Sequence, residues 1–148
     1  MKQLFTIGSS KKSAERFFEL LSDNNVRYVI DVRLYNTYQL AGFSKYPDIK
    51  YFLKKIADIE YISDSMFAPS ADLLSAYREK KIRWEDYTER FNQIMEMRGI
   101  IDYIETKYED LNDYCLLCSE DKPDKCHRRL LAEMICDHFG EYELKHLY

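Results

Sequence analysis

The sequence predicts an α/β fold, a three-layer domain in which a mostly parallel sheet of four or five strands is flanked by helices. The first reason is that short apolar segments alternate along the chain with longer segments whose apolar residues recur at helical spacing. The second is that 148 residues suit one domain with one core. The third is that only four Gly and three Pro interrupt the chain, so no linker stands out. We therefore expect residues 1–148 to form a single domain.

Each expected strand is a short apolar run that ends at a polar or glycine-containing turn, as strands buried on both faces of a sheet do. The expected strands cover residues 4–7, 28–32, 60–62, 114–118 and 143–147, and the third of them is a weak candidate. Gly8 ends the first strand, and we expect Ser9 or Ser10 to cap the helix that follows.

Each expected helix places its apolar residues on one face. The first helix ends at residues 23–25. The helix that begins near Trp84 should bury Trp84 and Tyr87 and break at Gly99, and Gly140 stands where a left-handed helix cap is expected. The other helices are expected at residues 48–56, 71–80 and 100–108 and after the turn that follows residue 118.

Composition and charge argue against some classes of protein. The net charge of −4 and the pI of about 5.4 make broad binding of duplex nucleic acid an unfavourable hypothesis. No apolar run has the length of a membrane span, and the N-terminal stretch is too short and polar for a signal peptide, so we expect a cytoplasmic protein without a membrane partner. Four cysteines in that compartment are expected to be free thiols, metal ligands or a catalytic group rather than disulfides.

The segment from residue 118 to residue 129 concentrates reactive side chains between an expected strand and an expected helix. Parallel α/β sheets bind ligands beyond the carboxyl ends of their strands, at helix N-termini. We therefore expect a site here, with Cys118, Glu120, Cys126 and His127 as acid–base or nucleophilic groups. Arg128 would bind an anion, because arginines in the first turn of a helix oppose the helix dipole and should face something negative.

A metal site is an open alternative for the same segment. Cys118, Cys126 and His127 could converge across the loop, with Glu120 or His146 as a fourth ligand. We assign no metal ligand, because zinc sites usually show two compact pairs of ligands and here the second pair is adjacent in sequence. A C-x-x-C spacing begins at residue 115, but residues three apart on a strand point to opposite faces and should not share an ion.

A structural interpretation also stays open. The arginines of the turn could pair with Glu120, Asp121 or Asp124, which would make the turn a structural lock. The protein would then be a non-enzymatic module that binds a protein or a nucleic-acid strand through the aromatic loop at residues 34–47. The aromatic residues of that loop, which could equally seal the core beneath it, are Tyr35, Tyr38, Phe43 and Tyr46.

A second candidate site lies at the carboxyl end of the second strand. Alternation places Asp31 and Arg33 on the same side of that strand. Ser9 and Ser10 follow the first strand and could add hydroxyl and N–H donors at the same edge. The structural alternatives are a local ion pair that fixes the loop and a serine that caps a helix.

Four short segments together carry a resemblance to a known family. They are, in chain order, Thr6-Ile7-Gly8-Ser9-Ser10, Val29-Ile30-Asp31-Val32-Arg33, Trp84-Glu85-Asp86-Tyr87, and Leu116-Leu117-Cys118-Ser119-Glu120 with Cys126-His127-Arg128. Through them the chain resembles, over essentially its whole length, the domain-of-unknown-function family numbered 488, which consists of bacterial and archaeal α/β proteins. The resemblance implies the fold and the position of a site. It implies no reaction, because no activity is established for the family.

The chain departs from the commoner pattern of that family at two places. Ser9 stands where a His is usual after Ile-Gly, so a general base at this position is absent. Tyr35-Asn36-Thr37 follows Asp31-Val32-Arg33 where a Pro-rich, Ser-containing stretch is usual. A ligand pocket built on this loop would therefore differ in shape.

The function expected from the sequence is that of an enzyme that binds a phosphate-bearing ligand, a nucleotide or nucleic acid, at the carboxyl edge of the sheet. The residues expected to hold that ligand are Ser9, Ser10, Asp31, Arg33 and Arg128. The alternatives are the interaction module and a metal-binding domain. The sequence names no cofactor and sets no oligomeric state.

Overall fold

The computed structural model describes residues 1–37, 41–108 and 112–148. Within these residues five strands form a sheet in the order β3-β2-β4-β1-β5, and every pairing in it is parallel. The strands are β1 (Lys2–Gly8), β2 (Tyr28–Asp31), β3 (Glu60–Ser63), β4 (Tyr114–Cys118) and β5 (Tyr142–Leu147). The predicted three-layer α/β fold is confirmed, including the weak candidate strand near residue 60.

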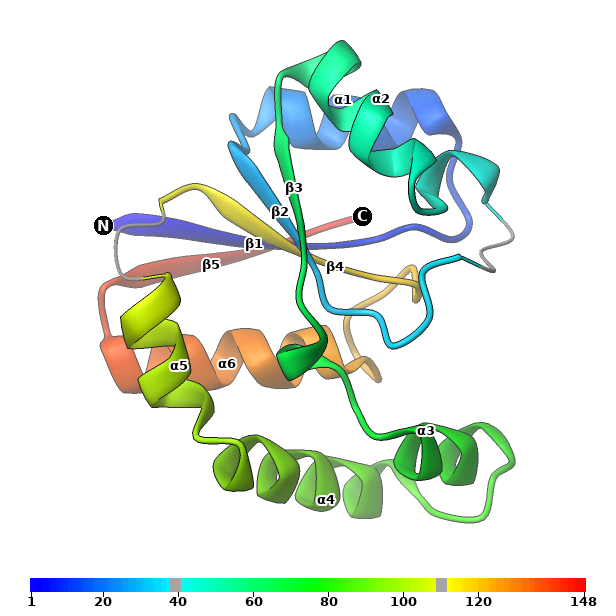
Figure 1. Ribbon diagram of the computed structural model, residues 1–148, viewed down its shortest axis with the longest axis vertical. Coiled ribbons are helices and arrows are strands. Elements are labelled where there is room, and N and C mark those ends of the chain that lie inside the picture. The colour runs from blue at the N-terminus through cyan, green and yellow to red at the C-terminus, as the bar shows by residue number, and fades with distance from the viewer. Residues whose placement is uncertain (38–40, 109–111) are drawn as a thin grey trace.

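Helices cover both faces of the sheet (Figure 1). One layer contains α1 (Ala14–Asp23) and α2 (Asp48–Ala57). The opposite side of the sheet carries α3 (Ala71–Arg78), α4 (Trp84–Met97), α5 (Ile100–Lys107) and α6 (His127–Phe139). Gly99 separates α4 from α5 with a φ of +64°, and Gly140 ends α6 with a φ of +68°, as predicted. None of the helices in the described part of the chain is both long and apolar enough to span a membrane.

Each face of the sheet has its own hydrophobic core, because successive residues of a strand point to opposite faces. On β1, Leu4 joins the core that also holds the buried residues of α4, α5 and α6, whereas Phe5 joins the core under α1 and α2. The same alternation on β4 sends Cys118 to the first of these cores and Cys115 to the second. The prediction that these two thiols point to opposite faces of the sheet is therefore confirmed.

The prediction that Ser9 or Ser10 caps the first helix is wrong. The cap of α1 is Ser13, whose Oγ accepts a hydrogen bond from the backbone N–H of Arg16 at 3.1 Å. The backbone N–H groups of Ser9 and Ser10 instead donate to carbonyl oxygens at the end of β4, both at 3.0 Å. The chain thus continues past Gly8 along β4 before it turns into the helix.

Gly8 marks a close approach between the end of β1 and the loop that follows β4. A Cβ atom at position 8 would lie 1.6 Å from the carbonyl oxygen of Glu120, so only glycine fits there unless the backbone moves. Lys12 strengthens this junction, since its Nζ donates to the Gly8 carbonyl oxygen at 2.8 Å and pairs with Asp121 Oδ1 at 2.7 Å. These contacts fix the loop that carries the candidate site.

Candidate functional site

A cavity of about 340 Å³ lies at the carboxyl ends of β2 and β4 and at the N-terminus of α6. One wall consists of residues 33–35, 118–120 and 125–127, which follow the two strands and lead into α6. The other wall comes from α3, the first turn of α4 and the connection between them. A cavity of this size suits a small molecule, and its place matches the ligand-binding edge of parallel α/β sheets.

Three of the predicted reactive residues converge on this cavity. Cys118 is the last residue of β4, Cys126 is the N-cap of α6 and His127 is the first residue of that helix. All three are buried, and their Sγ and ring nitrogen atoms lie within 4.8 Å of one another. The Sγ atom of Cys118 lies 3.6 Å from Nδ1 of His127. The loop therefore brings Cys118 together with Cys126 and His127, which follow it eight and nine positions later, in a compact cluster of two sulfur atoms and one nitrogen atom.

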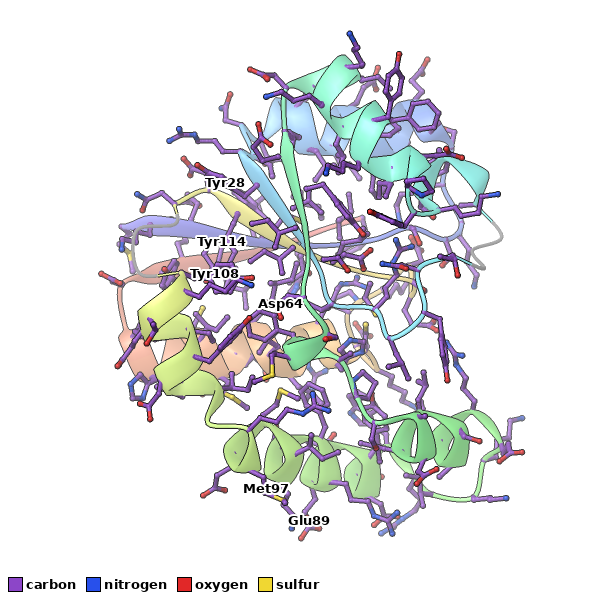
Figure 2. All side chains as sticks on the ribbon, in the orientation of Figure 1. Tyr28, Asp64, Glu89, Met97, Tyr108 and Tyr114 are labelled. Carbon is purple, nitrogen blue, oxygen red and sulfur yellow. The ribbon has the colours of Figure 1, made fainter. Side chains whose placement is uncertain are left out.

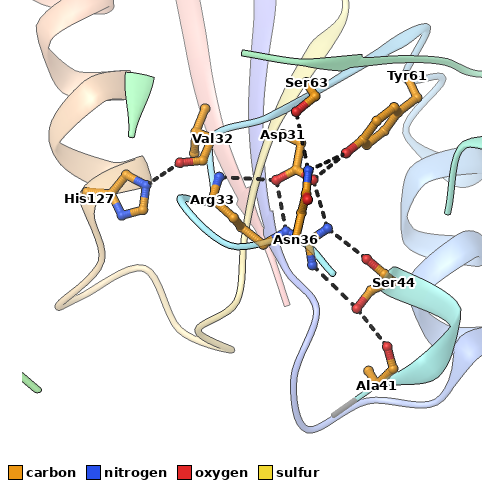
Figure 3. Close-up of polar contacts among 9 residues, drawn as sticks. All are labelled: Asp31, Val32, Arg33, Asn36, Ala41, Ser44, Tyr61, Ser63 and His127. Atoms are coloured by element: carbon orange, nitrogen blue, oxygen red, sulfur yellow. Dashed lines mark hydrogen bonds and ion pairs between the residues drawn. The ribbon is translucent and has the colours of Figure 1, made fainter. Parts of the chain in front are cut away.

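The ring of His127 has a fixed orientation. Its Nε2 atom lies 2.7 Å from the carbonyl oxygen of Val32, just beyond β2 (Figure 3). Because a carbonyl oxygen only accepts, Nε2 carries the hydrogen and Nδ1 faces Cys118. The ring of Phe91 packs beside the imidazole, with 5.6 Å between the ring centroids. His127 thus joins the ends of two neighbouring strands.

The protonation states within the cluster follow from its contacts. The Cys126 thiol donates a hydrogen bond to Cys118, and this bond, with the nearby charge of His127, holds the pKa of Cys118 well below the ordinary thiol value despite burial. Burial and the neighbouring Cys118 thiolate raise the pKa of Cys126 well above that value. Burial lowers the pKa of His127, but the Cys118 charge outweighs it and the pKa is raised. Both directions favour the charged forms, a thiolate at Cys118 and an imidazolium at His127.

Arg128 does not expose its guanidinium to the cavity. The residue is fully buried, and its two terminal nitrogens donate to the carbonyl oxygens of Glu120 and, at 3.1 Å, of Asp121. One of them also donates to Cys126 Sγ at 3.7 Å. Arg128 therefore finds its negative partners in backbone carbonyls rather than in the carboxylates that the structural alternative named. Its predicted contact with a ligand stays a prediction, while its observed contacts brace the loop.

Asp31 and Arg33 form an internal ion pair (Figure 3). Arg33 Nε donates to Asp31 Oδ1 and Nη2 donates to Oδ2, both at 2.8 Å. The hydroxyl of Tyr61 donates to Oδ2 at 2.5 Å, and Arg33 Nη2 also donates to the carbonyl oxygen of Ser44 at 2.7 Å. Both members of the pair are buried. This geometry favours the structural alternative, in which the pair fixes the loop after β2.

Of the remaining residues considered in the sequence, one lines the cavity and the others do not. Glu120 is exposed and lines the cavity. Ser9 and Ser10 are absent from the cavity wall, as far as the described residues define it. His146 lies on β5, where its Nδ1 atom is 2.6 Å from Thr6 Oγ1. Of the two side chains considered as a fourth metal ligand, only Glu120 therefore faces the cavity.

Sequence reasoning missed the cations at this cavity. Arg78, Lys80 and Lys125 line it, all three are exposed, and no carboxylate of the described residues forms an ion pair with any of them. Arg78 ends α3 and Lys80 follows it in the connection to α4, so both looked like an ordinary solvent-exposed helix end. Lys125 lies in the reactive turn itself, and a search for basic side chains in that turn could have found it. Among the described residues of the wall, the other two positive groups, Arg33 and His127, are buried, so these three cations are the exposed ones.

Aromatic side chains form much of the opposite wall. Trp84, expected in the core, is only half-buried and lines the cavity, whereas Tyr87 is buried as predicted. The two rings stack with centroids 5.1 Å apart, and the Tyr77 ring lies 5.6 Å from Trp84. In the loop after β2, Tyr35 also lines the cavity. The other residues of that loop are Phe43, which packs on Phe17, Tyr46, which stacks on Tyr61, and Tyr38, which lies outside the described residues.

Comparison with known families gives one match. The model of the family described as "Domain of unknown function DUF488" matches residues 13–135 of the 148-residue chain. This range includes β2, β4, α3, α4 and the first part of α6, which together build the cavity. Searches among curated proteins and among solved structures found no match.

Proposed function

We propose that this chain, which belongs to the family Domain of unknown function DUF488, is an enzyme that acts on a small anionic, ring-bearing molecule of the nucleotide class. The observation that carries the proposal is a single cavity that joins the buried pair Cys118 and His127, with Sγ and Nδ1 3.6 Å apart, to three exposed cations that have no ion-pair partner among the described residues. Neither feature alone distinguishes an enzyme from a binding module. Their meeting in one cavity of about 340 Å³ supports the proposal, because a ligand bound there would lie beside Cys118.

The proposed ligand follows from the two kinds of side chain in the wall. Arg78, Lys80 and Lys125 would attract a phosphate group, opposed only by Glu120 among the cavity-lining carboxylates in the described part of the chain. The half-buried face of Trp84 offers a surface on which a heterocycle stacks. The chain carries a net charge of −4, so this local excess of positive charge is set against an acidic background. We therefore still propose a phosphate-bearing ligand, but with Arg78, Lys80 and Lys125 as the residues that hold its phosphate group.

The proposed reaction uses the cluster as a nucleophile and its acid. The Cys118 thiolate attacks an electrophilic carbon of the ligand, a bond from sulfur to carbon forms, and the bond from that carbon to the leaving group breaks. The leaving group takes the proton from Nδ1 of His127. Water then attacks the same carbon, gives a proton back to His127, and releases Cys118 as the thiolate. The hydrogen bond from the Cys126 thiol would stabilise the negative charge on Cys118 before the first step and after the second.

We also propose a cytoplasmic location. All four cysteines are free, and a reduced thiolate is required for the proposed chemistry. An oxidising compartment would work against both conditions. Fractionation of cells that express the full chain would test this location.

Ligand binding is tested by a thermal-shift screen of tag-free protein with nucleoside monophosphates, the matching nucleosides and inorganic phosphate. We expect at least one nucleotide to raise the Tm by several degrees at about 100 times its Kd, because a ligand that binds the folded state stabilises it by mass action. The matching nucleoside should shift the Tm less. The same nucleotide should slow alkylation of Cys118 by iodoacetamide, mapped by mass spectrometry.

Two variants with equal charge changes provide the control. Arg78→Gln/Lys80→Gln/Lys125→Gln removes the cationic rim and should abolish the nucleotide shift. A triple Lys→Gln variant outside the cavity should preserve it, and its positions are Lys45, Lys50 and Lys55, all exposed. The proposed function is wrong if no nucleotide shifts the Tm and Cys118 is alkylated with the pH midpoint of an ordinary thiol.

A further inference from the structure

We infer that Cys118, Cys126 and His127 form a binding site for Zn²⁺ in which one coordination position opens on the cavity. The inference goes beyond the proposed function and holds whether or not a nucleotide binds. Within residues 1–37, 41–108 and 112–148, these three side chains are the group of His, Cys, Asp and Glu residues that comes close enough to hold a metal ion. All three are buried, so they are held in place by the surrounding fold.

The distances within the cluster fit a tetrahedral zinc ion. With bonds of about 2.3 Å from zinc to sulfur and about 2.0–2.1 Å from zinc to nitrogen, tetrahedral angles place the two ligand atoms about 3.6 Å apart. The distance from Cys118 Sγ to His127 Nδ1 is 3.6 Å. The third ligand atom, Cys126 Sγ, lies within 4.8 Å of both. The three ligand atoms therefore lie close enough together to reach one ion.

The groups around the three side chains also suit metal ligands. Histidines that bind a metal through one ring nitrogen usually donate the other N–H to a carbonyl oxygen or carboxylate, and Nε2 of His127 donates to Val32 at 2.7 Å. Nδ1 is thereby left to face the sulfur atoms. Arg128 donates to Cys126 Sγ at 3.7 Å, which would stabilise that sulfur as a thiolate once the metal displaces its proton.

The ligand types select the ion. Two thiolates and an imidazole favour a borderline-soft ion such as Zn²⁺ over Mg²⁺ or Ca²⁺, which prefer oxygen ligands. Three protein ligands leave a fourth position, and all three residues line the cavity, where a water molecule or an anionic group of a ligand could occupy it.

Zinc would also control the proposed chemistry. A sulfur bound to Zn²⁺ is a ligand rather than a free nucleophile, so occupancy of the site would withdraw Cys118 from reaction. The proposed function belongs to the metal-free state of the cluster, and the zinc-bound state is its blocked form. This consequence rests on the proposed function, whereas the binding site itself does not.

The test uses the full-length, tag-free chain after removal of metal with a chelator. We expect titration of Zn²⁺ against a chromophoric chelator to give one ion per chain, and Co²⁺ to give a sulfur-to-metal charge-transfer band in the near ultraviolet. Cys126→Ser and His127→Gln should each weaken Zn²⁺ binding at least about 10–100-fold, the loss typical when even an outer partner of a metal ligand is removed. Cys136→Ser, which changes a half-buried thiol outside the cluster, should bind Zn²⁺ as the unaltered chain does.

Several outcomes would overturn the inference. One is the absence of stoichiometric Zn²⁺ binding by the unaltered chain, and another is equal affinity in a folded Cys126→Ser variant, where circular dichroism establishes folding. If Zn²⁺ fails to bind while a nucleotide still protects Cys118 from iodoacetamide, the metal site is wrong and the proposed function stands. If Zn²⁺ binds and no nucleotide does, the metal site stands and the proposed function fails.

Discussion

Two buried polar clusters stand side by side at the carboxyl edge of the sheet, and they differ in what their groups can still do. At the end of β2, the Asp31 carboxylate accepts hydrogen bonds from Arg33 and Tyr61 (Figure 3). Arg33 also donates a hydrogen bond to the carbonyl oxygen of Ser44. At the end of β4, the Cys118 sulfur faces His127 and borders the cavity. The first cluster is saturated by the protein, whereas the second has room for another partner.

The two clusters also differ in how they respond to the loss of a partner. Arginine cannot lose its charge in a protein, so a buried Arg33 without Asp31 would stay charged and unpaired. Histidine can lose its proton near neutral pH, so His127 without Cys118 would simply become neutral. Reactive residue types therefore do not by themselves identify a functional site. A functional site is better identified by groups that can change their partner or their protonation state.

The largest effect on stability should come from Asp31→Asn. The substitution keeps the size of the side chain and removes the charge that neutralises buried Arg33, so we expect a loss of about 3–5 kcal/mol in the free energy of unfolding. Urea denaturation followed by circular dichroism measures it. Asp23→Asn, at the exposed end of α1, is the matched control and should change that free energy by less than about 0.5 kcal/mol. A loss equal to that of the control would remove the contrast between the two clusters.

A third polar cluster resembles the saturated one. The Asp64 carboxylate, just after β3, accepts hydrogen bonds from the hydroxyls of Tyr108 at 2.5 Å and Tyr103 at 2.7 Å, and from Lys107 Nζ at 3.2 Å. Asp64 and Tyr108 are labelled in Figure 2. Burial raises the pKa of Asp64, but these donors outweigh it and the pKa is lowered from 3.8. The cluster ties α5 to the end of β3 and lines no part of the cavity.

Asp64→Asn should destabilise the protein by about 2 kcal/mol at pH 7, because the amide replaces an ionised acceptor of several hydrogen bonds. The folded pKa of Asp64 lies below the unfolded value of about 3.8, so its contribution is fully present above that pH and is lost as the pH falls through the folded pKa. The difference between Asp64→Asn and the unaltered chain should therefore shrink below about pH 4. Urea denaturation across this pH range measures it, and a difference that grows on acidification would contradict the assignment.

The wall of the cavity at the ends of β2 and β4 could be predicted from the sequence, whereas the wall from α3 and α4 could not. Apolar runs and the polar turns that end them mark the carboxyl edges of strands, and this pattern located Cys118 and His127. The wall from α3 and α4 depends on how those helices pack against the sheet, which helical spacing does not reveal. Arg78 therefore looked like a solvated helix end, and Trp84 like a core residue, although both line the cavity.

The mistaken helix cap and the unforeseen protein partners of Arg128 have a related cause. Ser9 and Ser10 match the composition of a helix cap, but their N–H groups are bound to carbonyl oxygens at the end of β4, a long-range contact that local sequence does not encode. The anion-binding role predicted for Arg128 likewise followed from its place in the first turn of a helix. Its observed partners are carbonyl oxygens of the preceding loop. Every residue has a carbonyl oxygen, so the residue types of that loop do not indicate which of these oxygens accept hydrogen bonds.

The smallest effect on stability should come from Cys118→Ser, the substitution that most directly disables the proposed chemistry. Serine nearly preserves the shape of the side chain, and His127 can shed its proton, so no uncompensated charge stays buried. We expect the free energy of unfolding at pH 8 to change by less than about 1 kcal/mol, while alkylation of the cluster by iodoacetamide disappears. Cys136→Ser is the control, because it makes the same exchange of sulfur for oxygen on α6, outside the cluster. A loss of 3 kcal/mol or more, on the scale of the ion-pair variants, would instead make the cluster a structural lock like that of Asp31 and Arg33.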